Sequence, residues 1–302
     1  MEFREILKNT NLDFIGIRNK TFAISAVLLC LGLVAFVMIS FGKANMSIDF
    51  TGGTSLQIKF ADVVSIGDLR DALTDGGLRD VQIQEVSGTG EFLVKTKMTD
   101  TEKEKVQDIV GQVISTKLTG KKYEILGSNM VGSSVGKTLK KNAIIAVVIS
   151  LIGIIIYIAW RFTYVFGLAA AIATFHDVIV MLGIFWALGE EMNILFITAL
   201  LTIAGYSLTD TVVVFDRIRE NMAKMKSKSD LGAVINVSIN EVLSRTIVTS
   251  LTVLLVLAAL LVLGGKVLFE FSLALVIGVI IGTYSSIFVA SPLVFLLRNK
   301  VR

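Results

Sequence analysis

Residues 21–40 read TFAISAVLLCLGLVAFVMIS, an apolar run long enough to cross a membrane as one helix. The hydrocarbon core of a bilayer is roughly 30 Å thick, which a helix of about 20 residues spans. Five further runs of this kind follow, so the sequence predicts a membrane α-helical protein. The six predicted transmembrane helices cover residues 21–40, 143–160, 164–188, 193–215, 243–263 and 268–297.

The composition agrees with this interpretation. Of the 302 residues, 54% are apolar and 18% are charged, and the mean hydropathy is +0.76. A soluble domain carries about 25% charged residues, so the composition argues against a soluble enzyme. The single cysteine, Cys30, cannot form an intramolecular disulfide, and no cysteines and histidines have zinc-ligand spacing. We expect neither a metal nor another cofactor.

The positive charges predict the orientation in the membrane. Lysine and arginine gather in residues 1–20, at Arg161, between residues 217 and 245, and in residues 298–302, all on one side of the helices. These residues favour the cytoplasmic side, so both termini are expected there. The net charge is +4, and we interpret the basic residues as attracted to the lipid headgroups. No nucleic acid partner is expected.

The orientation divides the chain into five parts. Helix 1 stands apart from the other five, and the polar insert between helices 1 and 2 falls outside the cytoplasm. The parts are a cytoplasmic segment 1–20, transmembrane helix 1 within 21–42, an extracytoplasmic domain 43–141, transmembrane helices 2–6 within 142–297, and a cytoplasmic tail 298–302.

The insert alternates between the two-residue period of strands and the 3.6-residue period of helices. Strands are predicted at 55–61, 81–87, 91–97 and 122–127, and helices at 65–75 and 99–118. The second helix has a capping-box-like start at Thr99. The order βαββαβ is typical of an α+β ferredoxin-like domain.

Polar residues inside the predicted transmembrane helices indicate where the chemistry lies. A charged side chain at the bilayer centre costs about 2.5 to 3.5 kcal/mol and is retained only with a partner or a water-filled path. Asp210 lies in the inner half of the membrane, with Tyr206 one turn away and Thr209 beside it. We interpret these three residues as part of an ion path, and a structural hydrogen-bonding acid is the alternative.

The next helix offers a positive partner for this carboxylate. Arg245, Thr249 and Thr252 have the spacing i, i+4 and i+7, which predicts one helical face leading inward from the cytoplasmic end. Arg245 could pair with Asp210 and release it when the acid is protonated. Alternatively, Arg245 extends to the membrane interface and takes no part in the ion path.

His176 and Asp177 are a further polar pair within a membrane helix. His176 is the only histidine, and imidazole can relay protons near neutral pH. Adjacent residues point about 100° apart on a helix, so a buried packing histidine is the simpler interpretation. A proton relay through the two residues is the alternative.

Two further motifs lie at the ends of helices. Charged residues follow the Asp210 helix and could form a cytoplasmic anchor or only interfacial salt bridges; they are Asp216, Arg217, Arg219 and Glu220. Outside, the run IDFTGGT (48–54) interrupts a strand pattern, and its motif residues are Asp49, Phe50, Gly52, Gly53 and Thr54. No P-loop lysine follows the glycines, so a bulge or a close backbone approach is favoured over phosphate binding.

Together these motifs resemble a known family. The run IDFTGGT after the first helix, the extracytoplasmic domain 43–141 and GYSLTDTVVVFDRIREN at 205–221 are similar to SecF, the family of smaller membrane subunits in the bacterial SecD/SecF export complex. The 1+5 arrangement of helices matches as well, and the resemblance covers residues 21–297. It implies the architecture of the resistance-nodulation-division superfamily, in which SecD and SecF each contribute a six-helix half.

The resemblance implies a subunit of an ion-gradient-driven accessory motor in the bacterial cytoplasmic membrane. It would work with SecD and the SecYEG channel, with SecA and YajC as further partners, to complete translocation of a secretory polypeptide. Asp210 would be the membrane carboxylate of the ion path and Arg245 its partner. The coupling ion would be H⁺ or, alternatively, Na⁺, and without an ATP-binding motif the chain is not expected to be an enzyme.

Three other hypotheses compete with the motor. A small-molecule exporter of the same superfamily needs larger apolar-lined outer modules than residues 43–141 provide. A purely structural subunit would tolerate a neutral residue at Asp210. An intramembrane hydrolase requires a Ser/Lys or paired-Asp constellation, which the predicted helices do not show.

Overall fold

The structure is a computed structural model, and it describes residues 10–78, 81–86, 90–96, 105–224 and 230–301. The chain divides into two compact units. One contains the membrane helices; the other contains residues 46–145 and 192–194 and holds the β-sheet. Six helices in the described ranges are long and apolar enough to cross a membrane, as the sequence predicts.

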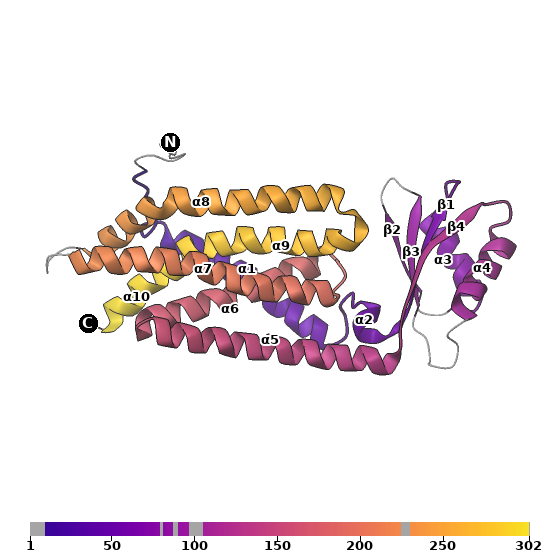
Figure 1. The fold of residues 1–302 in the computed structure, drawn as a ribbon, viewed down its shortest axis with the longest axis horizontal. Coiled ribbons are helices and arrows are strands. Elements are labelled where there is room, and N and C mark those ends of the chain that lie inside the picture. Colours follow the sequence, from indigo (N-terminus) through magenta and orange to yellow (C-terminus); the bar gives the residue numbers. More distant parts are fainter. Residues whose placement is uncertain (1–9, 79–80, 87–89, 97–104, 225–229, 302) are drawn as a thin grey trace. The chain divides into compact units, whose positions relative to one another are not determined.

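These helices form an elongated bundle (Figure 1). They are α1 (Arg18–Ser40), α5 (Ser133–Arg161), α6 (Tyr164–Ala187), α7 (Ile194–Lys224), α8 (Leu231–Leu263) and α9 (Gly265–Ser285). A π-helical turn, η1 (Ser286–Ala290), continues α9 into α10 (Ser291–Val301).

Several helices are longer than their apolar runs. α5 begins at Ser133 instead of residue 143, α8 begins at Leu231 instead of residue 243, and α7 continues past residue 215 to Lys224. Hydropathy detects only the segment that suits lipid, whereas the backbone hydrogen-bond ladder continues into polar sequence. The predicted membrane spans at these ends therefore lie within longer helices.

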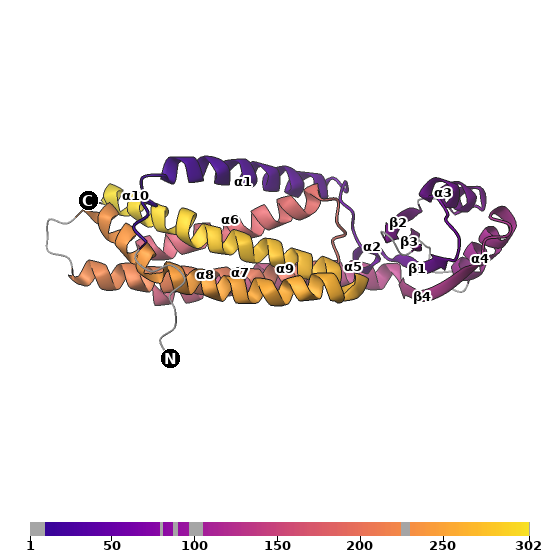
Figure 2. The same cartoon turned by 90° about the horizontal axis from the view of Figure 1, so that it is seen from above.

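The bundle has an inner and an outer set of helices. About half of the apolar stretch is buried in α6, α7 and α9–α10 (56%, 50% and 56%), but little of it in α1, α5 and α8 (17%, 11% and 17%). α1 lies along α6 (Figure 2), where Gly32 and Gly183 allow the two backbones to meet. The outer three helices leave a large apolar surface for lipid or a partner.

The π-helical turn has a cause in the sequence. Pro292 in the first turn of α10 has no N–H to donate to a preceding carbonyl, which disrupts the regular α-helical ladder. The helix widens over Ser286–Ala290, and the hydroxyl of Ser291 donates to the carbonyl of Ser286 at 2.9 Å. The wide turn leaves Ser285 at the bundle centre, fully buried.

The second unit has the predicted ferredoxin-like fold. Its elements are α2 (Ile48–Thr51), β1 (Gly53–Phe60), α3 (Ile66–Asp75), β2 (Gln82–Val86), β3 (Glu91–Thr96), α4 (Lys105–Lys117) and β4 (Tyr123–Val131). The sheet order is β2-β3-β1-β4, and all neighbouring strands are antiparallel. Alternate strand residues such as Leu56, Ile58 and Phe92 pack against Leu69 of α3 and Ile114 of α4.

Two local details differ from the sequence prediction or lie beyond it. Residues 48–51 form a short helix capped by the Ser47 side chain, and the first strand begins at Gly53, earlier than predicted. The capping-box-like start at Thr99 lies outside the described residues. Ser65 caps α3 by accepting a hydrogen bond from the Asp68 N–H.

Candidate functional site

The buried polar cluster around Asp210 is the candidate ion site. Asp210 lies on α7 with 8% of its surface exposed, and its Oδ2 is buried without a hydrogen-bond partner among the described residues. The Tyr206 hydroxyl, one turn earlier, is also buried without a hydrogen-bond partner among the described residues. Ser250 of α8 lies next to both residues and shares a hydrogen bond of 2.7 Å with Thr283 of α9.

Thr246 extends this cluster along α8. It lies one turn before Ser250, is buried, and has a hydroxyl without a partner in the described part of the chain. Unsatisfied polar atoms are costly in a membrane interior unless water or an ion completes their hydrogen bonds. The cluster therefore has the chemistry to hold water or a small cation between α7, α8 and α9.

Arg245, Thr249 and Thr252 lie on one face of α8, as their spacing predicts. These three residues are exposed, and the buried face of this helix instead carries Thr246 and Ser250. Within the described ranges no ion pair joins Arg245 to Asp210. Charge and spacing in the sequence point to the most polar face of α8. The face that packs against α9 in the structure carries small hydroxyl residues instead.

A similar stripe is exposed on α7. Thr202, Gly205 and Thr209 lie on the outside of the unit, and the two threonine hydroxyls donate to backbone carbonyls four residues earlier. Thr209, predicted beside Asp210 in the ion path, is thus outside the buried cluster. Small residues and satisfied hydroxyls at this spacing suit close contact with another membrane helix.

Asp177 on α6 is the centre of a second polar cluster, and it is fully buried. Its carboxylate accepts hydrogen bonds from Ser207 of α7 and, at 2.7 Å, from Ser285 of α9. Nδ1 of His176 lies 2.9 Å from the other carboxylate oxygen, and Nε2 of His176 is buried without a partner among the described residues. His176 is thus buried, as the packing interpretation predicts, and it is bonded to its neighbour Asp177. The sequence did not indicate Ser207 and Ser285 as partners of Asp177.

The charged residues at the end of α7 form ion pairs within the chain. Asp216 binds Arg161 of α5, with oxygen–nitrogen distances of 2.7 and 3.0 Å, and it lies 3.6 Å from Arg219. The pairs formed by the other two predicted anchor residues are Arg217–Glu220, Arg217–Glu241 and Glu220–Lys224, each at 2.6 Å. Sequence reasoning missed Arg161 and Glu241, whose positions depend on tertiary packing.

The glycine pair is a place of close backbone approach. Gly52 and Gly53 have φ angles of +71° and +134°, which favour glycine. A Cβ atom on Gly52 would lie 2.7 Å from Cα of Ser133, and one on Gly136 would lie 2.7 Å from the backbone nitrogen of Gly52. The start of α5 thus occupies the space beside the glycines.

The other residues of the IDFTGGT motif stabilise the same region, where the glycine pair meets the start of α5. Phe50 and Thr54 are buried, and Oδ2 of Asp49 accepts a hydrogen bond from the N–H of Ile194 at 3.2 Å. Asp49 therefore links the short helix α2 to the start of α7. In the described residues no group of three metal-ligating side chains is found.

Comparisons with known proteins agree with this architecture. Residues 100–300 match the family model of the protein export membrane protein SecD/SecF, C-terminal part, and residues 39–62 match the SecD/SecF GG motif. The translocase subunit SecF of Thermodesulfovibrio yellowstonii is 48% identical over 297 residues, which cover 98% of both chains. SecF of Endomicrobium trichonymphae is 38% identical over 97% of this chain and 93% of its own length.

A solved structure shares the whole fold. The crystal structure of SecDF, a translocon-associated membrane protein from Thermus thermophilus, has a TM-score of 0.85 and 37% identity. The match covers 99% of this chain and 40% of that one. Six membrane helices, a glycine-pair motif and a ferredoxin-like domain thus define a multi-pass membrane protein of the SecD/SecF export class. Within that class, the chain belongs to the SecF family of protein translocase subunits.

Proposed function

We propose that this chain is one half of an ion-gradient-driven accessory motor that completes the translocation of secretory polypeptides. It acts with SecD and the SecYEG channel, and with SecA and YajC, in the bacterial cytoplasmic membrane. Both termini are cytoplasmic, and the domain of residues 43–141 lies on the outer side. The chain hydrolyses no ATP, and the ion gradient supplies the energy.

The Asp210 cluster is the observation that carries this proposal. A carboxylate oxygen, a phenol and a threonine hydroxyl are buried in the membrane-spanning unit without partners in the described residues. A proton on Asp210 would neutralise its charge and give it a donor for a neighbouring oxygen. H⁺ is therefore the favoured coupling ion, and Na⁺ is the alternative because carboxylate and hydroxyl oxygens also suit it.

The available energy fits small repeated movements. One charge that crosses 100 mV releases about 2.3 kcal/mol, which can bias a two-state equilibrium whose gap is of similar size. One ion cannot unfold a stable domain, since domains are stabilised by about 5–15 kcal/mol. The motor would therefore prevent backsliding of a polypeptide that is already unfolded.

The exposed polar stripes of α7 and α8 support SecD as the partner in the membrane. Thr202, Gly205 and Thr209 on α7, and Arg245 and Thr249 on α8, are exposed and lie within the predicted transmembrane segments. An exposed arginine there is unfavourable in lipid, so a second six-helix half would cover it. The relative named SecDF is longer than this chain, which matches 37% of its length. Its remaining length leaves room for such a half.

The experiment is export of a secretory precursor into vesicles that hold this chain, SecD and SecYEG, with SecA and ATP. An H⁺ or Na⁺ gradient is imposed, and wild type is compared with Asp210→Asn. The control is Ser272→Ala, which removes another buried, unpartnered hydroxyl, on α9. We expect Asp210→Asn to assemble normally and to lose the gradient-dependent part of export, while Ser272→Ala keeps it.

The two gradients identify the ion, because only the coupling ion stimulates the wild type. A small-molecule exporter would show no gradient-dependent export of the precursor. If Asp210→Asn exports as well as wild type under every gradient, the motor hypothesis fails. The structural-subunit hypothesis would then replace it.

A further inference from the structure

A short segment ahead of α1 is held on the first turns of α8 by two asparagine side chains. Residues 12–16, which we call the strap, form neither helix nor strand. Oδ1 of Asn240 accepts a hydrogen bond from the N–H of Leu12 at 3.0 Å, and Nδ2 of Asn240 donates to the carbonyl of Leu12 at 2.9 Å. A carboxamide can pair with a peptide in this way because it offers a donor and an acceptor side by side.

The second asparagine lies one helical turn earlier. Oδ1 of Asn236 accepts from the N–H of Ile15 at 3.0 Å, and its Nδ2 donates to Oδ1 of Asp13 at 2.7 Å. The same Asp13 oxygen accepts from the N–H of Gly16 at 2.8 Å, which closes a turn in the strap. Asn236 and Asn240 together bind three backbone groups and one side chain of a segment more than two hundred residues away in the chain.

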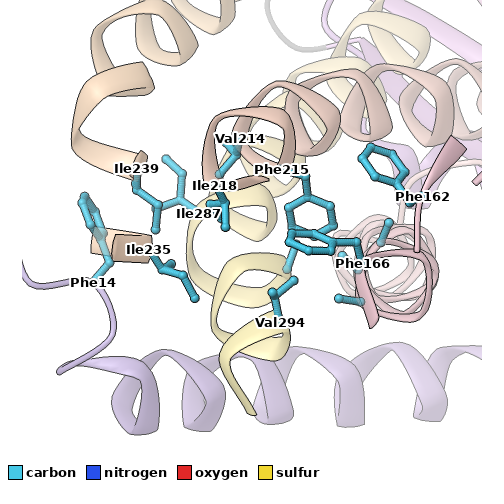
Figure 3. Packing of buried hydrophobic residues seen from close by; sticks show 14 of the residues in the cluster. Phe14, Phe162, Phe166, Val214, Phe215, Ile218, Ile235, Ile239, Ile287 and Val294 are labelled. Carbon is cyan, nitrogen blue, oxygen red and sulfur yellow. The ribbon is translucent and has the colours of Figure 1, made fainter. Parts of the chain in front are cut away.

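Apolar contacts complete the attachment. Phe14 and Ile15 are only 4% and 5% exposed, although they precede the first membrane helix. Phe14 lies against Phe288 with ring centroids 5.6 Å apart, and it belongs to the same core as Ile235 and Ile239 of α8 (Figure 3). The strap is therefore part of the packed unit.

The opposite side of this helix segment is attached to α7. Asn221 donates to Ser238 at 3.0 Å and to Glu241 at 2.6 Å, and Arg217 binds the same Glu241 oxygen at 2.6 Å. The start of α8 is thus held between the strap and α7, which restrains its rotation about the helix axis. Arg245 follows Glu241 after one turn, so any rotation at this point changes the direction of Arg245.

We propose that Asn236 and Asn240 are positioning residues that use the strap to fix the rotation of α8 and, with it, the outward direction of Arg245. The inference rests on the proposed function, in which a SecD half covers the face of α8 that carries Arg245. The asparagines touch no ion; they act through the backbone of residues 12–15. Loss of the strap lets α8 rotate, and Arg245 leaves the face that the partner half covers.

The test uses the full chain with SecD in nanodiscs, and Asn240→Leu as the variant, because leucine keeps the volume and loses both hydrogen bonds. Val237→Ala is the control, since Val237 is exposed on the same turns of α8. Hydrogen exchange of residues 12–16 is measured first. We expect at least tenfold faster exchange in Asn240→Leu and no change in Val237→Ala.

Rotation of α8 is measured by thiol labelling. The only natural cysteine, Cys30, is replaced by serine, and single cysteines are placed at the exposed position Thr249 and the buried position Ser250. Labelling is done on the full chain purified without SecD, because the proposed SecD half would cover position 249. There, in the wild-type background, the cysteine at 249 reacts faster than the one at 250. We expect Asn240→Leu to reduce this ratio severalfold, and Asn240→Gln, which keeps both hydrogen-bonding groups, to restore part of it.

Two results would overturn the positioning role. One is exchange of the wild-type strap as fast as an unstructured peptide, and the other is an unchanged labelling ratio when the strap is free. Gradient-dependent export is then measured in the same variants, and we expect it to fall severalfold with Asn240→Leu. If the ratio changes while export does not, positioning of α8 stands, and the part that the covered Arg245 face plays in the proposed motor is overturned.

Discussion

The hydroxyl of Ser207 on α7 donates a hydrogen bond to the carboxylate of Asp177 on α6. Ser207 lies one turn before Asp210 on the same helix, so the buried acids Asp177 and Asp210 are linked through a single helical turn. Ser285, held at the bundle centre by the π-helical turn, binds the same carboxylate oxygen of Asp177 from α9. The three inner helices thus meet at one carboxylate.

This cluster predicts a large effect for Asp177→Asn. The carboxylate faces three donors, and an amide has only one oxygen, so at least one donor loses its acceptor or meets an N–H. We expect the unfolding free energy to fall by about 1–3 kcal/mol. Thermal unfolding of the purified chain in detergent would show this loss, and Ser286→Ala, whose hydroxyl bonds only to its own helix, should cost much less.

The same variant has a spectroscopic readout. His176 is the only histidine, so ¹⁵N-labelled histidine reports on one ring. In wild type we expect the tautomer with hydrogen on Nδ1, because that nitrogen faces Asp177 and Nε2 has no partner in the described residues. Asp177→Asn should weaken this preference. An unchanged spectrum would show that Asp177 does not control the ring.

The main features of the fold were predictable because they depend on local patterns. Six apolar runs predicted six membrane helices, and alternation within residues 43–141 predicted the four strands and their helices. The helix ends were not predictable, because backbone hydrogen bonding continues where hydropathy stops. Leu231, the first residue of α8, follows a capping Asp230 that lies well outside the apolar run.

The candidate site was predictable only in part. Asp210 and Tyr206 were identifiable because acids and phenols are rare in apolar helices. Thr246 and Ser250 were not, since their importance depends on which face of α8 meets α7 and α9. The role of Asn240 could not be predicted, because its partner is the backbone of Leu12. Every residue has the same backbone groups, so the sequence does not show which of them a side chain will bind.

Asp13 predicts the pH dependence of the strap. Hydrogen bonds from the Gly16 N–H and the Asn236 side chain hold the pKa of Asp13 below its ordinary value of 3.8, and the charge of Arg18 acts in the same direction. A lowered pKa means that the charged form stabilises the strap. This contribution is complete above the ordinary pKa and is lost as the pH falls through the lowered one.

The strap should therefore stay equally protected from about pH 8 to pH 5 and loosen below about pH 4. Hydrogen exchange of residues 12–16, corrected for the intrinsic rate at each pH, measures this. Asp13→Asn should remove the acid-dependent part, because an amide does not titrate. Loosening between pH 7 and pH 5 would contradict the prediction and indicate control by another group.

The glycine-pair joint gives the last prediction, Gly136→Ala. Gly136 on α5 faces the backbone of Gly52, and an added Cβ would lie 2.7 Å from the Gly52 nitrogen. The atoms that must give way belong to the backbone, so they cannot turn aside as a flexible side chain would. We expect the unfolding free energy to fall by about 1–3 kcal/mol, as in other overpacked sites.

The matched control is Gly153→Ala on the same helix, where an added Cβ meets nothing within 4 Å. Alanine has the higher helix propensity, so this control should be neutral or stabilising by up to about 1 kcal/mol. Unfolding of the full chain and hydrogen exchange of residues 48–56 would be measured together. Gly136→Ala should speed exchange in this segment, because α2 and the start of β1 lose their support. If both variants behave alike, the glycine pair does not serve as a close-packed joint with α5.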